Sequence, residues 1–223
     1  MNSNMKNLLV IPALNEESHI TQVIQAARPY IHDILVVDDG SEDGTAAAAA
    51  GAGVQVKRHE QNKGKGEALK TAFAYAVREG YDWVFTIDGD GQHDPEDLKG
   101  FFQMLDRYDL LIGDRMQNTR RIPFIRLVAN QTSSAIVSAL CGCRIHDSQS
   151  GFRAYKVELI RSLNLTTHRY ELESELLIRA ARKGFRIGHC GIQTIYAGEK
   201  SRYQNVQDSL RFLSMAARSV FWW

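Results

Sequence analysis

The sequence of 223 residues predicts a single α/β domain with a mostly parallel central sheet flanked by helices. Short apolar runs alternate with stretches of helical periodicity through the first half of the chain, as crossover connections between parallel strands require. Clusters of polar residues and glycine follow these apolar runs, at the sheet edge where open α/β folds bind ligands. The length suits one domain with its own core.

Five short apolar runs in the first half predict strands, and the stretches between them predict helices. The strands are expected at residues 8–11, 34–37, 54–56, 83–87 and 110–112. Helices are expected at 20–27, 46–50 and 64–77, and another begins at Pro95 with Asp94 as its N-cap.

The second half of the chain has a less regular pattern. It predicts helices at 124–140 and at 172–184, with a polar turn at 146–150 between them. Strand-like segments follow at 185–187 and 192–197, and a basic amphipathic helix closes the chain. We therefore expect residues 1–204 to form the main domain and residues 205–223 to form the closing helix.

The composition argues against a nucleic-acid-binding protein, a zinc-binding protein and a membrane-spanning protein. The net charge of +1 gives no global field that favours a nucleic-acid partner. Three cysteines, with a polar start that is not a signal peptide, predict a reducing, cytoplasmic compartment. Cys141 and Cys143 have no second Cys/His pair at zinc-ligand spacing and are expected as thiols. No apolar run reaches the roughly 20 residues that cross a bilayer.

An acidic turn follows the fourth predicted strand. Asp88 and Asp90 are two residues apart, so they are expected to point the same way at the strand end, with Gln92 and His93 close behind. Oxygen ligands of this kind suit Mg²⁺ or Mn²⁺, which recruit phosphate oxygens. The alternatives are a plain turn and a calcium loop, but the calcium loop lacks its closing glutamate.

Three more polar loops are expected at the same edge of the sheet. Residues 12–17 follow the first strand, and residues 38–41 follow the second. Asp39 has the position of an acid that accepts hydrogen bonds from a ribose, or it caps a turn. Residues 62–66 form a basic glycine-rich loop with Lys63, suited to an anion but without the Walker spacing.

Together these motifs resemble the family-two glycosyltransferases of the GT-A, Rossmann-like fold, and within them the dolichyl or polyprenyl-phosphate sugar synthases. The resemblance runs from about Leu8 to Leu213. Its motifs are Pro12-Ala13-Leu14-Asn15-Glu16-Glu17, residues 36–45, Asn62-x-Gly64-x-Gly66, residues 88–95, Gly113-Asp114-Arg115 and residues 147–153.

The resemblance implies a nucleotide-sugar donor, a divalent metal and a role for each matching residue. The base and ribose pocket is implied for Pro12, Leu14, Glu16, Val37 and Asp39. Asp88, Gly89 and Asp90 meet the donor, with Lys63 in the basic loop, and Asp90 and Gln92 bind the metal. Arg115 holds phosphate. Arg202, in a Ser-Arg pair, matches the Ser-Lys pair of a loop over the pyrophosphate. Tyr196 and Leu14 depart from the usual arginine and tyrosine.

The resemblance also implies an inverting transfer, and two acceptor chemistries stay open. A hydroxyl acceptor needs a base, and Asp147 is the candidate. A polyprenyl phosphate is already an anion and needs cations, for which Arg115, Arg120, Arg121 and Arg126 form a basic cluster. If the acceptor is phosphate, Asp147 is expected to orient substrate or arginines. His93 and His146 are expected as hydrogen-bonded neighbours of the site rather than as metal ligands, the alternative. Glu171, Glu173 and Glu175 are spaced so that they cannot all face one way, and one or two of them are expected to support the arginines of the site.

The closing helix combines apolar residues, Arg211, Arg218 and two terminal tryptophans. This pattern equally fits the cytoplasmic interface of a bilayer, the protein core or a second subunit. Three rival functions remain: a transferase acting on a hydroxyl of a soluble glycan or protein, a nucleotidyltransferase, and a non-catalytic sugar-nucleotide sensor. The loop after the first strand argues against the second, and the complete acidic turn argues against the third.

Overall fold

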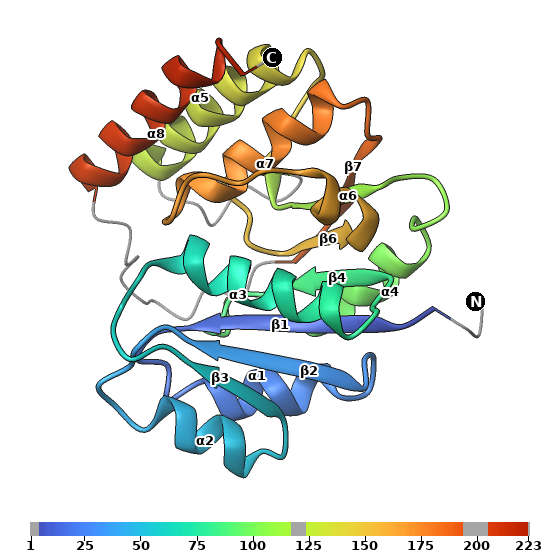
Figure 1. Cartoon of the computed structure of the whole chain (residues 1–223), viewed down its shortest axis with the longest axis vertical. Helices are drawn as coiled ribbons and strands as arrows, with labels where there is room; N and C mark the ends of the chain where they lie inside the picture. The colour runs from blue at the N-terminus through green and yellow to red at the C-terminus, as the bar shows by residue number, and fades with distance from the viewer. Residues whose placement is uncertain (1–4, 117–123, 194–204, 223) are drawn as a thin grey trace.

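The computed structural model describes residues 5–116, 124–193 and 205–222, and these form one mostly parallel α/β domain (Figure 1). The strands are β1 Asn7–Ala13, β2 Asp33–Asp38, β3 Gln55–Arg58, β4 Trp83–Thr86, β5 Leu110–Asp114, β6 Arg153–Lys156 and β7 Ile187–Gly191. The helices are α1 Ile20–Ala27, α2 Thr45–Gly51, α3 Lys65–Arg78, the 3₁₀ turn η1 Pro95–Asp97, α4 Leu98–Phe102, α5 Phe124–Cys141, α6 Val157–Ser162, α7 Glu171–Arg182 and α8 Asn205–Ser219.

The strands of the described residues form one sheet in the order β3-β2-β1-β4-β6-β5-β7. Neighbours are parallel except at β6, which runs antiparallel to both β4 and β5. Because β1, β2 and β4 are parallel, the loops that follow them leave the sheet at the same edge. This arrangement confirms the predicted fold class.

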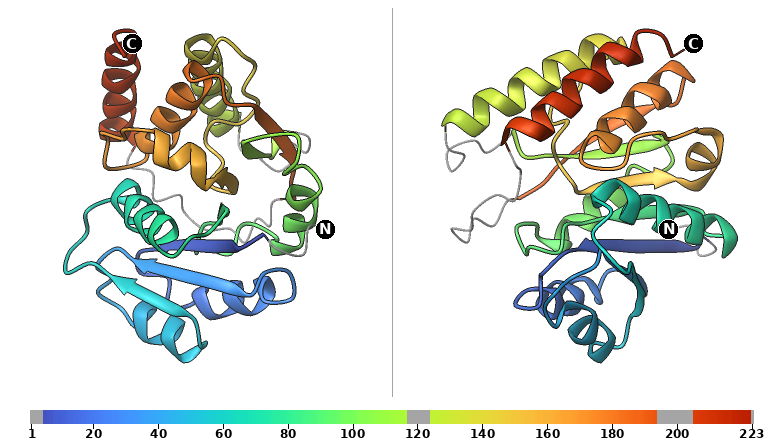
Figure 2. Two further views of the ribbon diagram at one scale, coloured as in Figure 1. Left: turned by 45° about the vertical axis from the view of Figure 1, so that its right-hand side comes forward. Right: turned by 60° about the vertical axis from the view of Figure 1, so that its left-hand side comes forward.

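Both faces of the sheet are covered, which explains why the inner strands β1, β2 and β4 carry consecutive buried apolar residues rather than an alternating pattern. Leu8 and Val10 of β1 face a core shared with α3, α5, α6, α7 and α8. Leu9 and Ile11 point the other way, into a core shared with α1, α2 and α4. The two views of Figure 2 show these helices on opposite sides of the sheet, with α5 and α8 side by side.

The five strands predicted in the first half are confirmed, and so is the Asp94 cap, whose Oδ1 accepts a hydrogen bond from the backbone N–H of Glu96. The predictions for the second half were partly wrong. Strand β6 and helix α6 were not predicted, because Arg153 at the start of β6 does not look like a buried strand residue. Strand β7 covers 187–191 instead of the expected 185–187, and residues 192–193 are not in a strand; the rest of the expected segment, 194–197, lies outside the described ranges.

The position of β7 depends on contacts that a periodicity search does not detect. It pairs with β5, and a Cβ on Gly188 would lie 2.6 Å from the ring of Tyr108. Gly188 therefore lets the strand pack closely against the Tyr108 ring, and a contact of this kind leaves no apolar pattern in the sequence. Among the described helices, none combines the length and hydropathy needed to cross a bilayer.

Candidate active site

Hydrogen bonds join the loops that follow β1 and β2. The hydroxyl of Ser41 accepts from the N–H of Asn15 at 2.8 Å, and the Asn15 side chain accepts from the N–H of Glu42 at 2.8 Å. The hydroxyl of Thr45, which is fully buried, accepts from the N–H of Glu16 at 2.7 Å. Asn15 has a φ of 51°, which asparagine tolerates better than most residues. The two motifs therefore form one unit.

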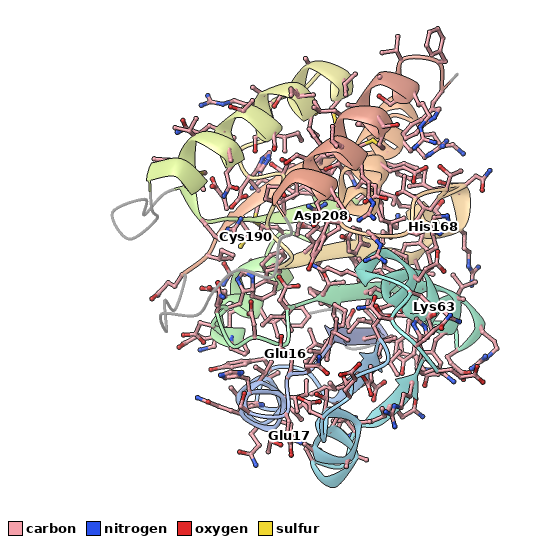
Figure 3. The ribbon with its side chains drawn as sticks, turned by 90° about the vertical axis from the view of Figure 1, so that its left-hand side faces the viewer. Glu16, Glu17, Lys63, His168, Cys190 and Asp208 are labelled. Carbon is pink, nitrogen blue, oxygen red and sulfur yellow. The ribbon has the colours of Figure 1, made fainter. Side chains whose placement is uncertain are left out.

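This unit lies against the acidic turn after β4. A Cβ on Gly89 would lie 3.4 Å from Cγ of Glu16 and 3.5 Å from Cβ of Ala13, so the turn passes directly over the first loop. Glu16, labelled in Figure 3, is buried. Pro12 and Val37 are neighbours in the register of β1 and β2. Leu14 is half-buried. The predicted base and ribose residues are thus brought together, although their contact with a nucleotide stays a prediction.

The carboxylate of Asp39 is held by the protein itself. Its Oδ1 lies 2.7 Å from His59 Nδ1 and accepts from the N–H of Lys63 at 3.0 Å, while Oδ2 accepts from the N–H of Gly64 at 2.7 Å. A carboxylate has about four acceptor positions, and contacts from the described residues occupy three of them; the predicted hydrogen bond from a ribose stays a prediction. Asp39 therefore anchors the glycine-rich loop as well as lying in the predicted pocket.

The glycine-rich loop is used differently from the prediction. A Cβ on Gly64 would lie 2.6 Å from the Arg169 side chain, and a Cβ on Gly66 would lie 2.6 Å from the backbone of His168. Because the two glycines have no Cβ, residues 168–169 can pack directly against this loop. The Lys63 side chain is exposed (Figure 3), whereas Lys65, which the sequence did not single out, turns inward.

Asp88 lies in a network of charged groups. Its Oδ1 is 2.7 Å from Lys65 Nζ, which is also 3.1 Å from Glu173 Oε2 on α7. Its Oδ2 is 3.7 Å from Nε2 of the buried His93. Burial alone would raise the pKa of Asp88, but the ammonium group of Lys65 outweighs burial and holds that pKa well below its usual value. Asp88 is a carboxylate with a fixed counter-ion.

Asp90 has a different environment two residues further on. Its Oδ1 accepts a hydrogen bond from the N–H of Gln92 at 3.0 Å within the turn. Burial raises the pKa of Asp90, and the negative charge of Asp88 adds to the rise. A divalent cation would relieve this repulsion, and carboxylate and amide oxygens are its preferred ligands. Asp90 and Gln92 therefore fit the predicted metal.

The acidic turn does not supply a complete metal cage. Within the described ranges, no three His, Cys, Asp or Glu side chains are grouped to hold a metal ion. Mg²⁺ is commonly held by one or two carboxylates and completed by substrate phosphates and water. The residues present therefore fit a metal that is bound jointly with a phosphorylated ligand.

Arg115 and Asp147 form a two-pronged ion pair. Arg115 Nε donates to Asp147 Oδ2 at 2.6 Å, and Nη2 donates to Oδ1 at 2.9 Å. Asp147 is fully buried, and although burial would raise its pKa, the Arg115 guanidinium lowers it. The neighbouring Asp114 lies 2.9 Å from His146 Nδ1, and the His146 ring stacks on His189 at 4.2 Å. Asp147 thus fixes the guanidinium of Arg115.

Arg153 is a buried residue of the site that sequence reasoning missed. Its guanidinium is 0% exposed and donates to the carbonyl oxygens of Ser150, Ser148 and Glu173 at 2.7, 2.7 and 2.9 Å. It therefore ties the loop at 148–151 to α7. The one signal in the sequence was its place at the end of the motif at residues 147–153.

The three glutamates of α7 separate as their spacing predicts. Glu173 meets Lys65 and lies 3.7 Å from Arg153 Nε, so it supports a lysine and an arginine of the site. Glu175 pairs with Arg179 and accepts hydrogen bonds from Thr166 and Thr167. Arg120, Arg121, Tyr196 and Arg202 lie outside the described residues, as does the side chain of Arg126.

The fold and these motifs define a glycosyltransferase, and comparison with known proteins identifies its family. Residues 8–163 match the sequence model of Glycosyl transferase family 2, so the chain belongs to that family. It is similar to the UDP-N-acetylglucosamine–dolichyl-phosphate N-acetylglucosaminyltransferase of Methanococcus voltae, with 37% identity over 213 residues, covering 84% of this chain and 85% of that protein. It is also similar to the polyprenol monophosphomannose synthase of Mycolicibacterium smegmatis, with 33% identity over 82% of this chain and 74% of that protein.

Solved structures confirm the GT-A fold. Glucosyl-3-phosphoglycerate synthase from Mycobacterium tuberculosis in complex with UDP superposes with a TM-score of 0.74 at 25% identity, covering 97% of this chain and 80% of that chain. Its complex with Mn²⁺, UDP and phosphoglyceric acid gives a TM-score of 0.71 at 26% identity, covering 98% and 77%.

Proposed function

We propose that this protein is an inverting glycosyltransferase that transfers a sugar from a UDP- or GDP-linked donor to a polyprenyl or dolichyl phosphate, with Mg²⁺ or Mn²⁺. Family membership supports the transferase class, and of the two relatives described above one is named for transfer to dolichyl phosphate and the other for the synthesis of polyprenol monophosphomannose. Neighbouring structures with Mn²⁺ and UDP support the metal and a nucleotide donor.

In this proposal the nucleotide-sugar donor binds at the joined loops after β1 and β2 and at the acidic turn after β4. The pocket of Pro12, Leu14, Glu16, Val37 and Asp39 takes the nucleoside. Asp90 and Gln92 hold the metal. When bound by these residues, a divalent metal would offset negative charge on the departing nucleoside diphosphate. The acceptor oxygen attacks the anomeric carbon as the bond to the donor phosphate breaks, which inverts that carbon.

The ion pair of Arg115 and Asp147 is the observation that favours a phosphate acceptor. Asp147 was the candidate base for a hydroxyl, yet both of its oxygens accept from Arg115 and its pKa is lowered. A carboxylate held this way is a weak base. A phosphate acceptor needs no base and needs an oriented cation, which Arg115 provides. In this proposal Asp147 positions Arg115.

The closing helix supports a lipid acceptor. Phe212 and Met215 of α8 are buried against the domain, so the helix packs on the core. On its other side Leu210 and Leu213 are 61% and 52% exposed, and Phe221 beyond its end is 81% exposed. Apolar side chains beside Arg218 suit a peripheral contact with a bilayer. We propose this contact for residues 205–223, with 1–204 as the catalytic domain.

The test is a transfer assay with UDP- and GDP-sugars, Mn²⁺ or Mg²⁺, and two acceptors that differ in one group, a short polyprenyl phosphate and the matching polyprenol. We expect product from the phosphate alone and none with EDTA. Asp90→Asn is expected to lower turnover at least about 100-fold, because it removes the carboxylate that binds the metal. Asp106→Asn, an exposed carboxylate, is the control.

Asp147→Asn separates the two acceptor chemistries. For a phosphate acceptor we expect about a tenfold rise in its KM, because Arg115 loses its orientation. Transfer to polyprenol or to 3-phosphoglycerate would contradict the lipid-phosphate acceptor and leave the transferase. Nucleotide-sugar binding without turnover on any acceptor would favour a sensor.

A further inference from the structure

Lys65 brings together three segments that are far apart in the sequence. It is the first residue of α3, its side chain is 15% exposed, and its ammonium group meets Asp88 of the acidic turn and Glu173 of α7. A buried ion pair of this kind needs each of its partners, because removing one leaves an uncompensated charge. Lys65 is therefore a fixed part of the site.

The carboxylate of Asp88 is confined on more than one side. Lys65 holds Oδ1, and a Cβ on Gly151 would lie 2.3 Å from Oδ2. Gly151 is itself fixed, since its carbonyl oxygen accepts from Thr86 Oγ1 at 2.8 Å. His93 lies near Oδ2, with its ring edge-on to Phe152 at 5.7 Å. Asp88 thus has little freedom to turn toward another ligand.

Asp90 carries the same functional group, and Lys65 and His93 act on it only from a longer distance, because within the described residues it has no ion pair at contact distance. The hydrogen bond to its Oδ1 comes from the backbone of its own turn. By spacing alone, two carboxylates so close together would both bind a divalent cation. The ion pairs of Lys65 make the two acids unequal.

We propose that Lys65 is a positioning residue that keeps Asp88 off the metal, so that Asp90 is the carboxylate that binds it. This inference rests on the proposed metal-dependent function. Lys65 offsets the charge of Asp88 and leaves that of Asp90 for the metal. With Asp88 paired to Lys65, a bound metal would have fewer protein carboxylates to bind and could be shared with the donor phosphates.

Loss of the Lys65 charge is expected to strengthen metal binding and to weaken catalysis. Without the ammonium group, Asp88 is released to bind the metal together with Asp90, and a nearby positive charge that opposes the metal is gone. The metal then moves relative to the donor, and a displacement of about 1 Å can cost on the order of 100-fold in rate. A purely structural role would not tighten metal binding.

The experiment is a titration of the protein with Mn²⁺, followed by electron paramagnetic resonance, with and without UDP. Lys65→Met, which keeps length and removes charge, is expected to lower the Mn²⁺ Kd at least about tenfold and to lower kcat at least about tenfold. Lys65→Arg should keep the Kd within about threefold. Lys70→Met, on the same helix and paired with Glu67, is the matched control.

Two further variants test the mechanism and do not depend on Lys65→Met folding. Asp88→Asn is expected to raise the Mn²⁺ Kd only a few-fold, against at least about 100-fold for Asp90→Asn. Lys65→Met with Asp88→Asn, which removes both charges, should return the Kd to within about threefold of the unmodified protein. Equal losses for the two aspartates, or an unchanged or weaker Kd in Lys65→Met, would overturn the inference. An Asp90→Asn protein that binds Mn²⁺ normally would instead overturn the proposed metal site.

Discussion

The loops after β1 and β2 are joined by hydrogen bonds to backbone N–H groups, whereas the acidic turn after β4 is held by buried charged side chains. Ser41, Asn15 and Thr45 provide the first kind of contact. Lys65, which pairs with Asp88 and Glu173, provides the second kind, and Arg153 holds the loop at 148–151 that packs against Asp88. Both regions lie at the same edge of the sheet, so their position does not explain the difference. We relate it instead to the kind of ligand that each region is proposed to bind.

Uncharged hydrogen bonds keep a shape over a wide range of pH and salt, which suits a pocket for a nucleoside. Buried charges set the local electrostatic potential, which suits a site for a metal and phosphates. When one partner of a buried pair is removed, however, the other is left as an uncompensated charge that destabilises the fold. We therefore expect substitutions of buried charged residues to lower the free energy of unfolding more than substitutions in the hydrogen-bonded loops.

Arg153→Met should have the largest effect on stability. It leaves three buried carbonyl oxygens without their donor and removes one of the two cations beside Glu173, so we expect the free energy of unfolding to fall by at least about 3 kcal/mol. Urea denaturation measures the change. Arg161→Met, which removes one exposed hydrogen bond to Val77, should cost about 0.5 kcal/mol or less. Similar losses in the two variants would contradict the comparison.

Thr45→Val should have an intermediate effect on the hydrogen-bonded loops. It leaves the N–H of Glu16 without its buried acceptor, so unfolding should become easier by about 1–2 kcal/mol. The KM for the nucleotide sugar should rise while the Mn²⁺ Kd stays constant, because the metal residues are on the other loop. Thr132→Val is the control, because the exposed hydroxyl of Thr132 donates to the carbonyl oxygen of Val128 in its own helix. A change in Mn²⁺ binding would show that the two regions are not separate.

His189→Gln should have the smallest effect and appear only in mild acid. Burial and the neighbouring His146 lower the pKa of His189 to about 4. The unfolded chain, with a pKa near 6.5, therefore binds more protons between about pH 6.5 and 4, so stability falls as the pH drops through that window. Since the ring is partly exposed, we expect a loss of about 1 kcal/mol.

Glutamine at 189 keeps an acceptor for the N–H of His146 and removes the titration. Unfolding measured at pH 7 and pH 4.5 should therefore show a flatter pH dependence in His189→Gln than in the unmodified protein. An equal slope in both proteins would assign the acid sensitivity to other groups.

The sequence by itself determined the fold class, the strands of the first half and the place of the acidic turn. These features depend on local properties: apolar runs favour buried strands, Asp94 and Pro95 start a turn of helix, and parallel strands deliver their loops to one edge. For the same reason the motif at residues 88–95 indicated a site before any contact was known.

Only the tertiary structure decided how the site residues are paired. Lys65 rather than Lys63 reaches the acidic turn, the glycines at 64 and 66 admit residues 168–169, and Asp147 is bound by Arg115. Strand β6 begins with a buried arginine because carbonyl oxygens from two other segments surround it. The energy of a buried charge depends on partners that the chain brings from distant positions, and neither periodicity nor spacing encodes those partners.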